Sequence, residues 1–173
     1  MPTSLPISVL PCYAKTEVIK MNWTTWNKSQ PAPLGLLLEA DPSEKQIAKY
    51  LEASHVFQLV DANEIIGVIC LLPLNKQQLE IMNIAVQPSK RNQGIGKMLL
   101  EKASDYAMKN GFSAIIVKTG NSSIDQLAFY QKNHFRMQQI VPNYFTKHYP
   151  DQTIIENGIA CLDQIILLKE IKS

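Results

Sequence analysis

One stretch of this chain constrains its fold more than any other, because a strand, a short turn with two glycines and a helix follow one another between Ile84 and Leu100. Such a junction directs free backbone N–H groups toward one spot, and the helix dipole adds partial positive charge there. Gly94 and Gly96 let a ligand approach the backbone, since neither carries a Cβ atom. The pattern therefore indicates a phosphate-binding site. Basic residues supply further positive charge nearby: Lys90, Arg91 and Lys97.

The same turn has a second interpretation, in which the glycines only shape the connection and the basic residues are solvated surface. Two other phosphate motifs do not fit this stretch. A P-loop requires the string G-x-x-x-x-G-K-[ST], which this sequence does not contain. A dinucleotide-binding fingerprint requires a third glycine, and Leu99 stands where that glycine would lie.

Hydrophobic periodicity predicts the other elements. We expect strands over residues 18–23, 56–60, 65–72, 78–86, 114–118, 137–141 and 159–168, and helices over about 41–53, 94–110 and 123–132. The sequence Ser123-Ile124-Asp125-Gln126 matches a capping box at the start of the last helix. The type of the apolar run 34–39 stays open, and residues 142–158 are predicted to be a long loop.

The order of these elements predicts an α/β (α+β) fold. Strand–helix–strand passages in the second half require parallel neighbours joined by right-handed crossovers. The hairpins in the first half and at the end are antiparallel, so we expect a mixed central sheet. A chain of 173 residues fits a single domain, 1–173, which buries enough surface to need neither disulfides nor metals.

Composition disfavours several classes of partner. The formal charge of +2 is too weak to favour nucleic acid or a membrane as the main partner. The three cysteines form no C-x-x-C pair, which indicates a reducing, cytoplasmic setting. The three histidines show no metal-ligand spacing, so we predict no metal site. Residues 1–17 lack a basic n-region and contain three prolines, so we predict an N-terminal extension on the surface or an irregular tail, not a signal peptide.

Two strings in the second half carry a family resemblance. The segment Arg91-Asn92-Gln93-Gly94-Ile95-Gly96 resembles motif A of the GNAT superfamily of acetyl-CoA-dependent N-acetyltransferases, whose pattern is Q/R-x-x-G-x-G/A. The preceding Ile84-Ala85-Val86-x-Pro88 is similar to the family's fourth strand. Downstream, Asn121 followed by Ala128-Phe129-Tyr130-Gln131-Lys132-x-x-Phe135 resembles motif B. The resemblance covers residues 56–168, most of the chain.

This resemblance implies a fold and a ligand. The sheet would be mixed and mostly antiparallel, with a V-shaped splay between strands 4 and 5 and helices on its flanks. Acetyl-CoA would bind in that opening as the acetyl donor, with its pyrophosphate on the turn 91–97 and its pantetheine arm along the strand edge 84–86. The cofactor-binding residues implied in this way are Ile84, Ala85, Val86, Arg91, Asn92, Gln93, Gly94, Ile95, Gly96, Lys97 and Asn121.

The resemblance also implies a reaction, the direct transfer of an acetyl group to a primary amine of a small molecule or peptide. Tyr130 lies where the family commonly has the tyrosine that protonates the departing thiolate, and a phenol with a pKa of about 10 suits that role. Glu80 is the candidate general base, and Asn83 is a candidate to line the same face. The backbone N–H of Ile84 or Ala85 is the candidate oxyanion donor.

Several alternatives stay open. Tyr130 could be a core aromatic, and Glu80 a solvated charge at a strand edge. A catalytically silent acyl-CoA sensor or scaffold would share these motifs, and an enzyme acting on other nucleotides could use the same turn. We expect segments 23–38 and 142–158 to build the acceptor site. The apolar run 165–168 could pair two copies into a homodimer or fill the core.

One position departs from the family pattern. A glycine usually stands directly before the motif B phenylalanine, and this chain has Asn133-His134-Phe135 instead. Asn and His tolerate a left-handed backbone better than most residues, so we expect the helix end to survive the change.

Overall fold

The computed structural model describes residues 21–172, and residues 1–20 and 173 lie outside the described part. The predicted N-terminal extension and the first residues of the predicted opening strand therefore lie outside it as well. None of the helices between residues 21 and 172 combines the length and the apolar character that a membrane span requires.

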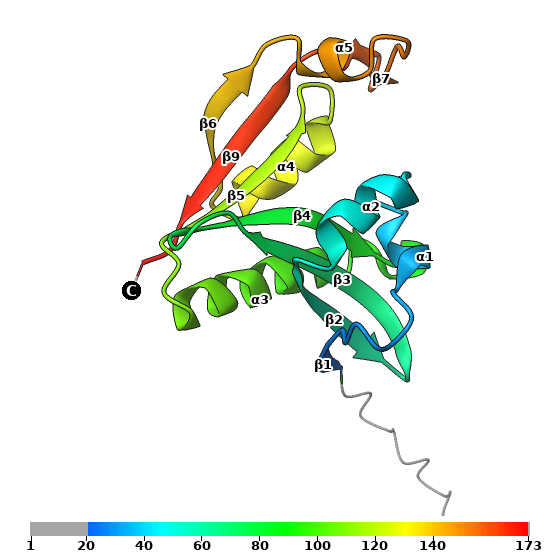
Figure 1. Ribbon diagram of the computed structural model, residues 1–173, viewed down its shortest axis with the longest axis vertical. Coiled ribbons are helices and arrows are strands. Elements are labelled where there is room, and N and C mark those ends of the chain that lie inside the picture. Colours follow the sequence, from blue (N-terminus) through cyan, green and yellow to red (C-terminus); the bar gives the residue numbers. More distant parts are fainter. Residues whose placement is uncertain (1–20, 173) are drawn as a thin grey trace, which may run out of the picture.

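Seven strands within residues 21–172 form one sheet in the order β1-β2-β3-β4-β5-β9-β6 (Figure 1). Neighbouring strands pair antiparallel, except that β4 and β5 pair parallel. The mixed, mostly antiparallel sheet expected from the sequence is thus confirmed. The strands are β1 (Asn22–Thr25), β2 (His55–Asp61), β3 (Glu64–Pro73), β4 (Gln78–Val86), β5 (Ala114–Gly120), β6 (Arg136–Val141) and β9 (Gln164–Glu170).

The parallel strands β4 and β5 stay together over only the first part of their length. Their pairing begins with Gln78 opposite Ala114 and ends with Ile81 opposite Val117. A β-bulge shifts the register of β4 against β3 at the same point, and a bulge bends the strand that carries it. Figure 1 shows β5, β9 and β6 fanning away from β4 beyond this point. The predicted V-shaped splay between strands 4 and 5 is confirmed.

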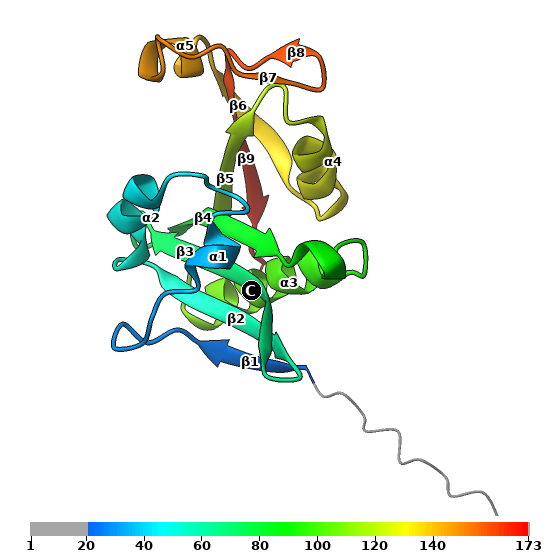
Figure 2. The same cartoon turned by 90° about the vertical axis from the view of Figure 1, so that its right-hand side faces the viewer.

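Helices cover both faces of the sheet (Figures 1 and 2). On one face, α3 (Ile95–Lys109) and α4 (Ile124–Lys132) share a large hydrophobic core with β2–β5 and β9. On the opposite face, α1 (Leu34–Leu37) and α2 (Glu44–Leu51) form a smaller core with β2–β4. The apolar run that the sequence left open is therefore helical at its start. The splay of β4 and β5 connects the two faces.

The boundaries of the predicted helices are mostly confirmed. The Ser43 hydroxyl accepts a hydrogen bond from the Gln46 N–H at 3.3 Å and caps α2. A short 3₁₀ turn, η1 (Pro88–Lys90), follows β4 before α3 begins. Gly111, with a φ of 76°, follows α3 in the left-handed conformation that ends many helices.

The predicted capping box at the start of α4 is wrong. Ser123 makes no side-chain cap hydrogen bond, and its hydroxyl donates to the Glu156 carboxylate at 2.7 Å. Ser122 donates to the same oxygen at 2.9 Å. Charged acceptors form stronger hydrogen bonds than neutral ones, and Glu156 stands far from Ser123 in the sequence, so the local pattern could not reveal it.

The predicted closing strand 159–168 is divided into two. Its first residues form β8 (Ile159–Ala160), which pairs with β7 (Ile155–Glu156) in a separate hairpin, and β9 starts only at Gln164. The break has a cause, because the Asn121 amide oxygen accepts the N–H groups of Leu162 and Asp163 at 2.8 and 2.9 Å. The predicted loop 142–158 contains a short helix, α5 (Tyr144–His148), which lies beside the hairpin at one end of the molecule (Figure 2).

Candidate active site

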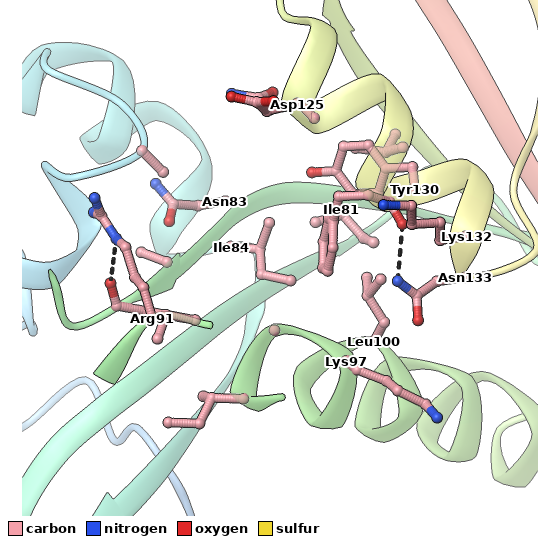
Figure 3. A pocket seen from close by; sticks show the side chains of 18 of the residues that line it. Ile81, Asn83, Ile84, Arg91, Lys97, Leu100, Asp125, Tyr130, Lys132 and Asn133 are labelled. Carbon is pink, nitrogen blue, oxygen red and sulfur yellow. Dashed lines mark hydrogen bonds between the residues drawn. The ribbon is translucent and has the colours of Figure 1, made fainter. Parts of the chain in front are cut away.

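A cavity of about 1320 Å³ opens where β4 and β5 separate. Its walls come from the α1–α2 connection, β4 and the turn after it, and from α3, β5 and α4. Figure 3 shows β4 crossing this space between α3 and α4. Nine of the eleven predicted cofactor-binding residues line the cavity, so the two sequence motifs do meet in one place. The exceptions among these predicted residues are Gln93 and Asn121.

The turn between β4 and α3 has the backbone geometry that its glycines suggested. Gly94 precedes α3 in the left-handed region, with a φ of 83°, which residues with a Cβ atom rarely adopt. Asn92, with a φ of 61°, takes the same conformation two residues earlier. The first N–H groups of α3 have no carbonyl partner within the helix, so they remain available for an anion.

Most cations near this turn already have carboxylate partners. The Arg91 Nη2 lies 2.7 Å from a Glu39 oxygen, and the Lys90 Nζ lies 3.1 Å from Asp61. The Lys97 Nζ lies 3.7 Å from Glu101 on the next turn of α3. These pairs neutralise part of the positive charge of Lys90 and Arg91 in the absence of a ligand. Gln93 contributes to the turn by donating from Nε2 to the Ser89 carbonyl at 3.3 Å.

One edge of β4 is free along the cavity. Residues Ile84, Ala85 and Val86 pair with β3 on one side. On the other side, the pairing with β5 has already ended at Ile81. Because all three residues line the cavity, an extended ligand can lie along this edge and bond to its backbone groups.

Tyr130 reaches the cavity from α4. Its side chain is only 4% exposed and packs against the rings of Phe129 and Phe135, with centroid distances of 5.3 and 5.6 Å. Figure 3 shows its hydroxyl directed toward the space beside Ile81 and Ile84. Burial raises the pKa of the Tyr130 hydroxyl above its usual value, so the phenol keeps its proton at neutral pH. The residue is a core aromatic and a lining residue at once.

The end of α4 accommodates the missing glycine. His134 has a φ of 70°, the left-handed conformation expected at this position. The N–H of Phe135 still donates to the Tyr130 carbonyl at 3.1 Å and closes the helix end. Asn133 adds a side-chain hydrogen bond to the Phe129 carbonyl at 2.8 Å. The predicted survival of this helix end is confirmed.

Glu80 lies on the face of β4 that α1 and α2 cover. It pairs with Leu72 of β3, and Leu72 points to the same face as Cys70, two residues earlier, which belongs to the smaller core and pairs with Asn83. Its carboxylate accepts a hydrogen bond from the Lys118 ammonium at 2.9 Å and is almost fully buried. Glu80 is not among the described residues that line the cavity, whereas Lys118 is. Any hydrogen bond between this carboxylate and a ligand in the cavity would therefore have to pass through a water molecule.

Asn121 has contacts of a different kind from those expected. Its amide nitrogen donates to the Ala160 carbonyl at 3.0 Å, and its oxygen accepts from Leu162 and Asp163. The side chain thereby ties the turn after β5 to the connection between β8 and β9. These bonds occupy the amide with the chain itself, and the cavity wall lies elsewhere.

The segments expected to build the acceptor site also lie elsewhere. Trp23 packs beside Lys102, whose Nζ is 5.2 Å from its ring centre, and Trp26 joins the smaller core. Tyr144 stacks on His148 within α5. Other residues, none of which the sequence analysis named as a site residue, also line the cavity, and only contacts formed on folding bring them there. They are Glu39, Ala40, Met82, Lys118, Asp125, Gln126 and Phe129.

Comparison with known proteins identifies the family to which this site belongs. The model of the acetyltransferase (GNAT) family matches residues 17–135. The chain therefore belongs to the GNAT family and is an acyltransferase.

Individual relatives agree with this assignment. YvbK, an uncharacterised N-acetyltransferase of Bacillus subtilis strain 168, is 45% identical over 132 residues, which cover 76% of this chain and 84% of that protein. A GNAT acetyltransferase from Elizabethkingia anophelis, solved with acetyl-CoA bound, is 40% identical with a TM-score of 0.81 over 87% of this chain and 97% of its own. A Bacillus subtilis acetyltransferase in complex with CoA is 39% identical with a TM-score of 0.82 over 88% of this chain and 100% of its own.

Proposed function

We propose that this chain transfers the acetyl group of acetyl-CoA directly to a primary amine of a small molecule or peptide. The observation that carries the proposal is the shared cavity, which is lined both by residues of the turn 91–97, here called the phosphate turn, and by Tyr130. Similar structures were solved with acetyl-CoA or CoA, which supports the choice of donor.

The residues of this chain fit the donor. The N–H groups at the start of α3 and the left-handed Gly94 suit a pyrophosphate, because anions bind at helix N-termini. The free edge of β4 at Ile84–Val86 suits the amide groups of a pantetheine arm. Bound there, acetyl-CoA supplies an activated acetyl thioester at the splay. Of the eleven residues expected to bind the donor, Asn121 is left out of this proposal because its amide is occupied.

The groups around the splay suit aminolysis of a thioester. The neutral amine nitrogen attacks the carbonyl carbon, the carbon–sulfur bond breaks, and the departing thiolate takes a proton. Tyr130 is the proton donor in this proposal, since burial keeps its hydroxyl protonated. A backbone N–H of Ile84 or Ala85 stabilises the developing oxyanion.

Glu80 completes the proposal as the general base. Its pairing with Lys118 holds the carboxylate in place, and a water molecule carries the proton of the amine to it. This role requires that water reaches the buried carboxylate past Lys118, which lines the cavity.

The first test is a melting experiment with the purified full chain. A ligand that binds only the folded state raises the melting temperature by mass action. Acetyl-CoA should raise it clearly more than ADP does at the same concentration, and primary amines can then be screened by CoA release. If millimolar acetyl-CoA gives no rise, the phosphate turn does not bind this donor and the proposed function is wrong.

A further inference from the structure

The buried side-chain amide of Asn83 on β4, beside the cavity, has one polar atom without a hydrogen-bond partner among the described residues. Asn83 is 4% exposed, yet it is among the residues that line the cavity. Its Nδ2 donates to the Leu37 carbonyl at 2.9 Å and to the Tyr50 hydroxyl at 3.0 Å. Its Oδ1 is also buried and has no hydrogen-bond partner among residues 21–172.

The orientation of this amide follows from its partners. A backbone carbonyl only accepts hydrogen bonds, so the side of Asn83 that faces Leu37 must be the nitrogen. Exchanging the two ends would place the amide oxygen against the Leu37 carbonyl oxygen, and two acceptors cannot bond to each other. Figure 3 shows the Asn83 nitrogen on the side of the α1–α2 segment and the oxygen on the opposite side. The free group is therefore a hydrogen-bond acceptor, and a ligand that satisfies it must bring a donor.

Leaving such an acceptor without a partner opposes folding, because the group loses its hydrogen bonds to water. Native chains keep few of these groups, and one beside a cavity is satisfied when an N–H or O–H group enters. Asn83 is hydrogen-bonded to members of the core under α1 and α2, whereas Tyr130 belongs to the core under α3 and α4. The two side chains thus approach the splay from opposite faces of the sheet.

We propose that the Asn83 Oδ1 accepts a hydrogen bond from the acceptor amine and so holds its nitrogen on the α1–α2 side of the splay. This inference rests on the proposed function and adds a binding residue for the acceptor. A neutral amide oxygen takes one N–H of the amine and leaves the nitrogen lone pair free to point toward the thioester. The opposite face, with Tyr130, receives the leaving sulfur.

The α1–α2 connection forms part of the cavity wall beside this amide. The Oδ1 is covered, so the wall must shift slightly before an amine reaches it. Glu39 and Ala40 line the cavity directly after α1, whose Leu37 carbonyl holds the Asn83 amide. Glu39 is also paired with Arg91 of the phosphate turn.

Ethylamine tests the proposal, because it is small enough to enter the cavity whatever the size of the natural acceptor. We would measure CoA release from acetyl-CoA with ethylamine, the slow hydrolysis of acetyl-CoA without amine, and the rise in melting temperature with acetyl-CoA. Asn83→Leu removes the oxygen while keeping a similar shape. It should raise the KM for ethylamine about tenfold, as expected for a lost hydrogen bond to a buried group, and leave the acetyl-CoA-induced rise in melting temperature unchanged.

Tyr50→Phe is the matched control, since it removes one partner of the same amide but keeps the oxygen. Its KM for ethylamine should stay near that of the wild type. If Asn83→Leu does not fold, Asn83→Ala removes the same oxygen with a smaller side chain that offers no acceptor. The inference is overturned, while the proposed function stands, if the KM for ethylamine is unchanged in the Asn83 variants or rises equally in Tyr50→Phe. The same holds if the Asn83 variants bind acetyl-CoA more weakly than the wild type. A wild type that binds acetyl-CoA but shows no ethylamine-dependent CoA release would also overturn it. A wild type without an acetyl-CoA-induced rise would instead refute the proposed function.

Discussion

Gly96 and Phe129 touch where the phosphate turn meets α4. A Cβ atom added to Gly96 would lie 3.1 Å from two atoms of the Phe129 ring, closer than ordinary van der Waals contact. Phe129 precedes Tyr130 in the chain and contacts its ring. Glycine at position 96 therefore lets α4 approach the start of α3, and this approach fixes where the Tyr130 hydroxyl lies.

Gly96→Ala should disturb this contact. Overpacking opposes folding by about 1–3 kcal/mol, and alanine recovers up to about 1 kcal/mol through its helix propensity. We expect a net loss of roughly 1 kcal/mol in urea unfolding, together with weaker acetyl-CoA binding. Gly35→Ala is the control, because no described atom lies within 4 Å of its added Cβ, and it should not lose stability. An equal loss in both variants would contradict the packing argument.

Tyr130→Phe should separate catalysis from binding. Loss of a general acid lowers the rate by about 10²-fold to 10⁴-fold, so kcat should fall while the acetyl-CoA-induced rise in melting temperature stays. Because burial raises the pKa of this hydroxyl, the wild type should lose no activity through Tyr130 below about pH 10. Tyr106→Phe is a control on α3, where that ring packs against Phe57. An unchanged kcat in Tyr130→Phe would assign the proton transfer to another group.

Arg91→Gln should weaken acetyl-CoA binding and flatten its dependence on salt. The Arg91 side chain is 50% exposed even though it is paired with Glu39, so part of its charge can still act on phosphates. We expect a loss of affinity of about fivefold at low ionic strength and a smaller loss at 0.5 M salt. Glu39→Gln should not weaken binding. Neither variant should change the free energy of unfolding by more than about 1 kcal/mol, because exposed ion pairs contribute little.

The parts of the fold that follow local patterns could be predicted from the sequence. The amphipathic face of α3 and the left-handed end of α4 at His134 are set by neighbouring residues. The capping-box prediction was wrong because the Ser123 hydroxyl donates its hydrogen bond to Glu156, which is distant in sequence. The closing strand was misjudged because Asn121 bonds to residues about 40 positions away, at Leu162 and Asp163.

The candidate site likewise has a part that follows a local sequence pattern and a part that depends on contacts between distant residues. The phosphate turn is continuous in sequence, so its residues could be named in advance. The rest of the cavity wall is assembled from separate segments, and its contacts join residues such as Glu39 to Arg91 and Leu37 to Asn83. No periodicity or motif records which of these side chains meet, because their meeting depends on how α1 packs on β4.

Alkaline conditions should destabilise the chain from about pH 9 upward. Burial raises the pKa of the Cys70 thiol from 9.0 to about 12, and burial raises the pKa of Tyr50 to about 12. Above pH 9 the unfolded chain releases the Cys70 proton first, so the folded state binds more protons and the free energy of unfolding falls as pH rises. The fall should approach about 1.4 kcal/mol per pH unit for this thiol. In Cys70→Ala, urea unfolding at pH 8, 9.5 and 10.5 should show that the early part of the fall is gone.

His134→Gly should stabilise the chain. A residue with a Cβ atom in the left-handed conformation is less stable by roughly 1–2 kcal/mol, and glycine loses about 0.5–1 kcal/mol more backbone entropy on folding. With the His134 φ at 70°, we expect a net gain of about 0.5–1 kcal/mol in urea unfolding. Gln131→Gly, inside α4, should instead lose about 1 kcal/mol, because glycine there only lowers helix propensity. Should both variants lose stability alike, then the His134 side chain makes contacts that outweigh its backbone strain.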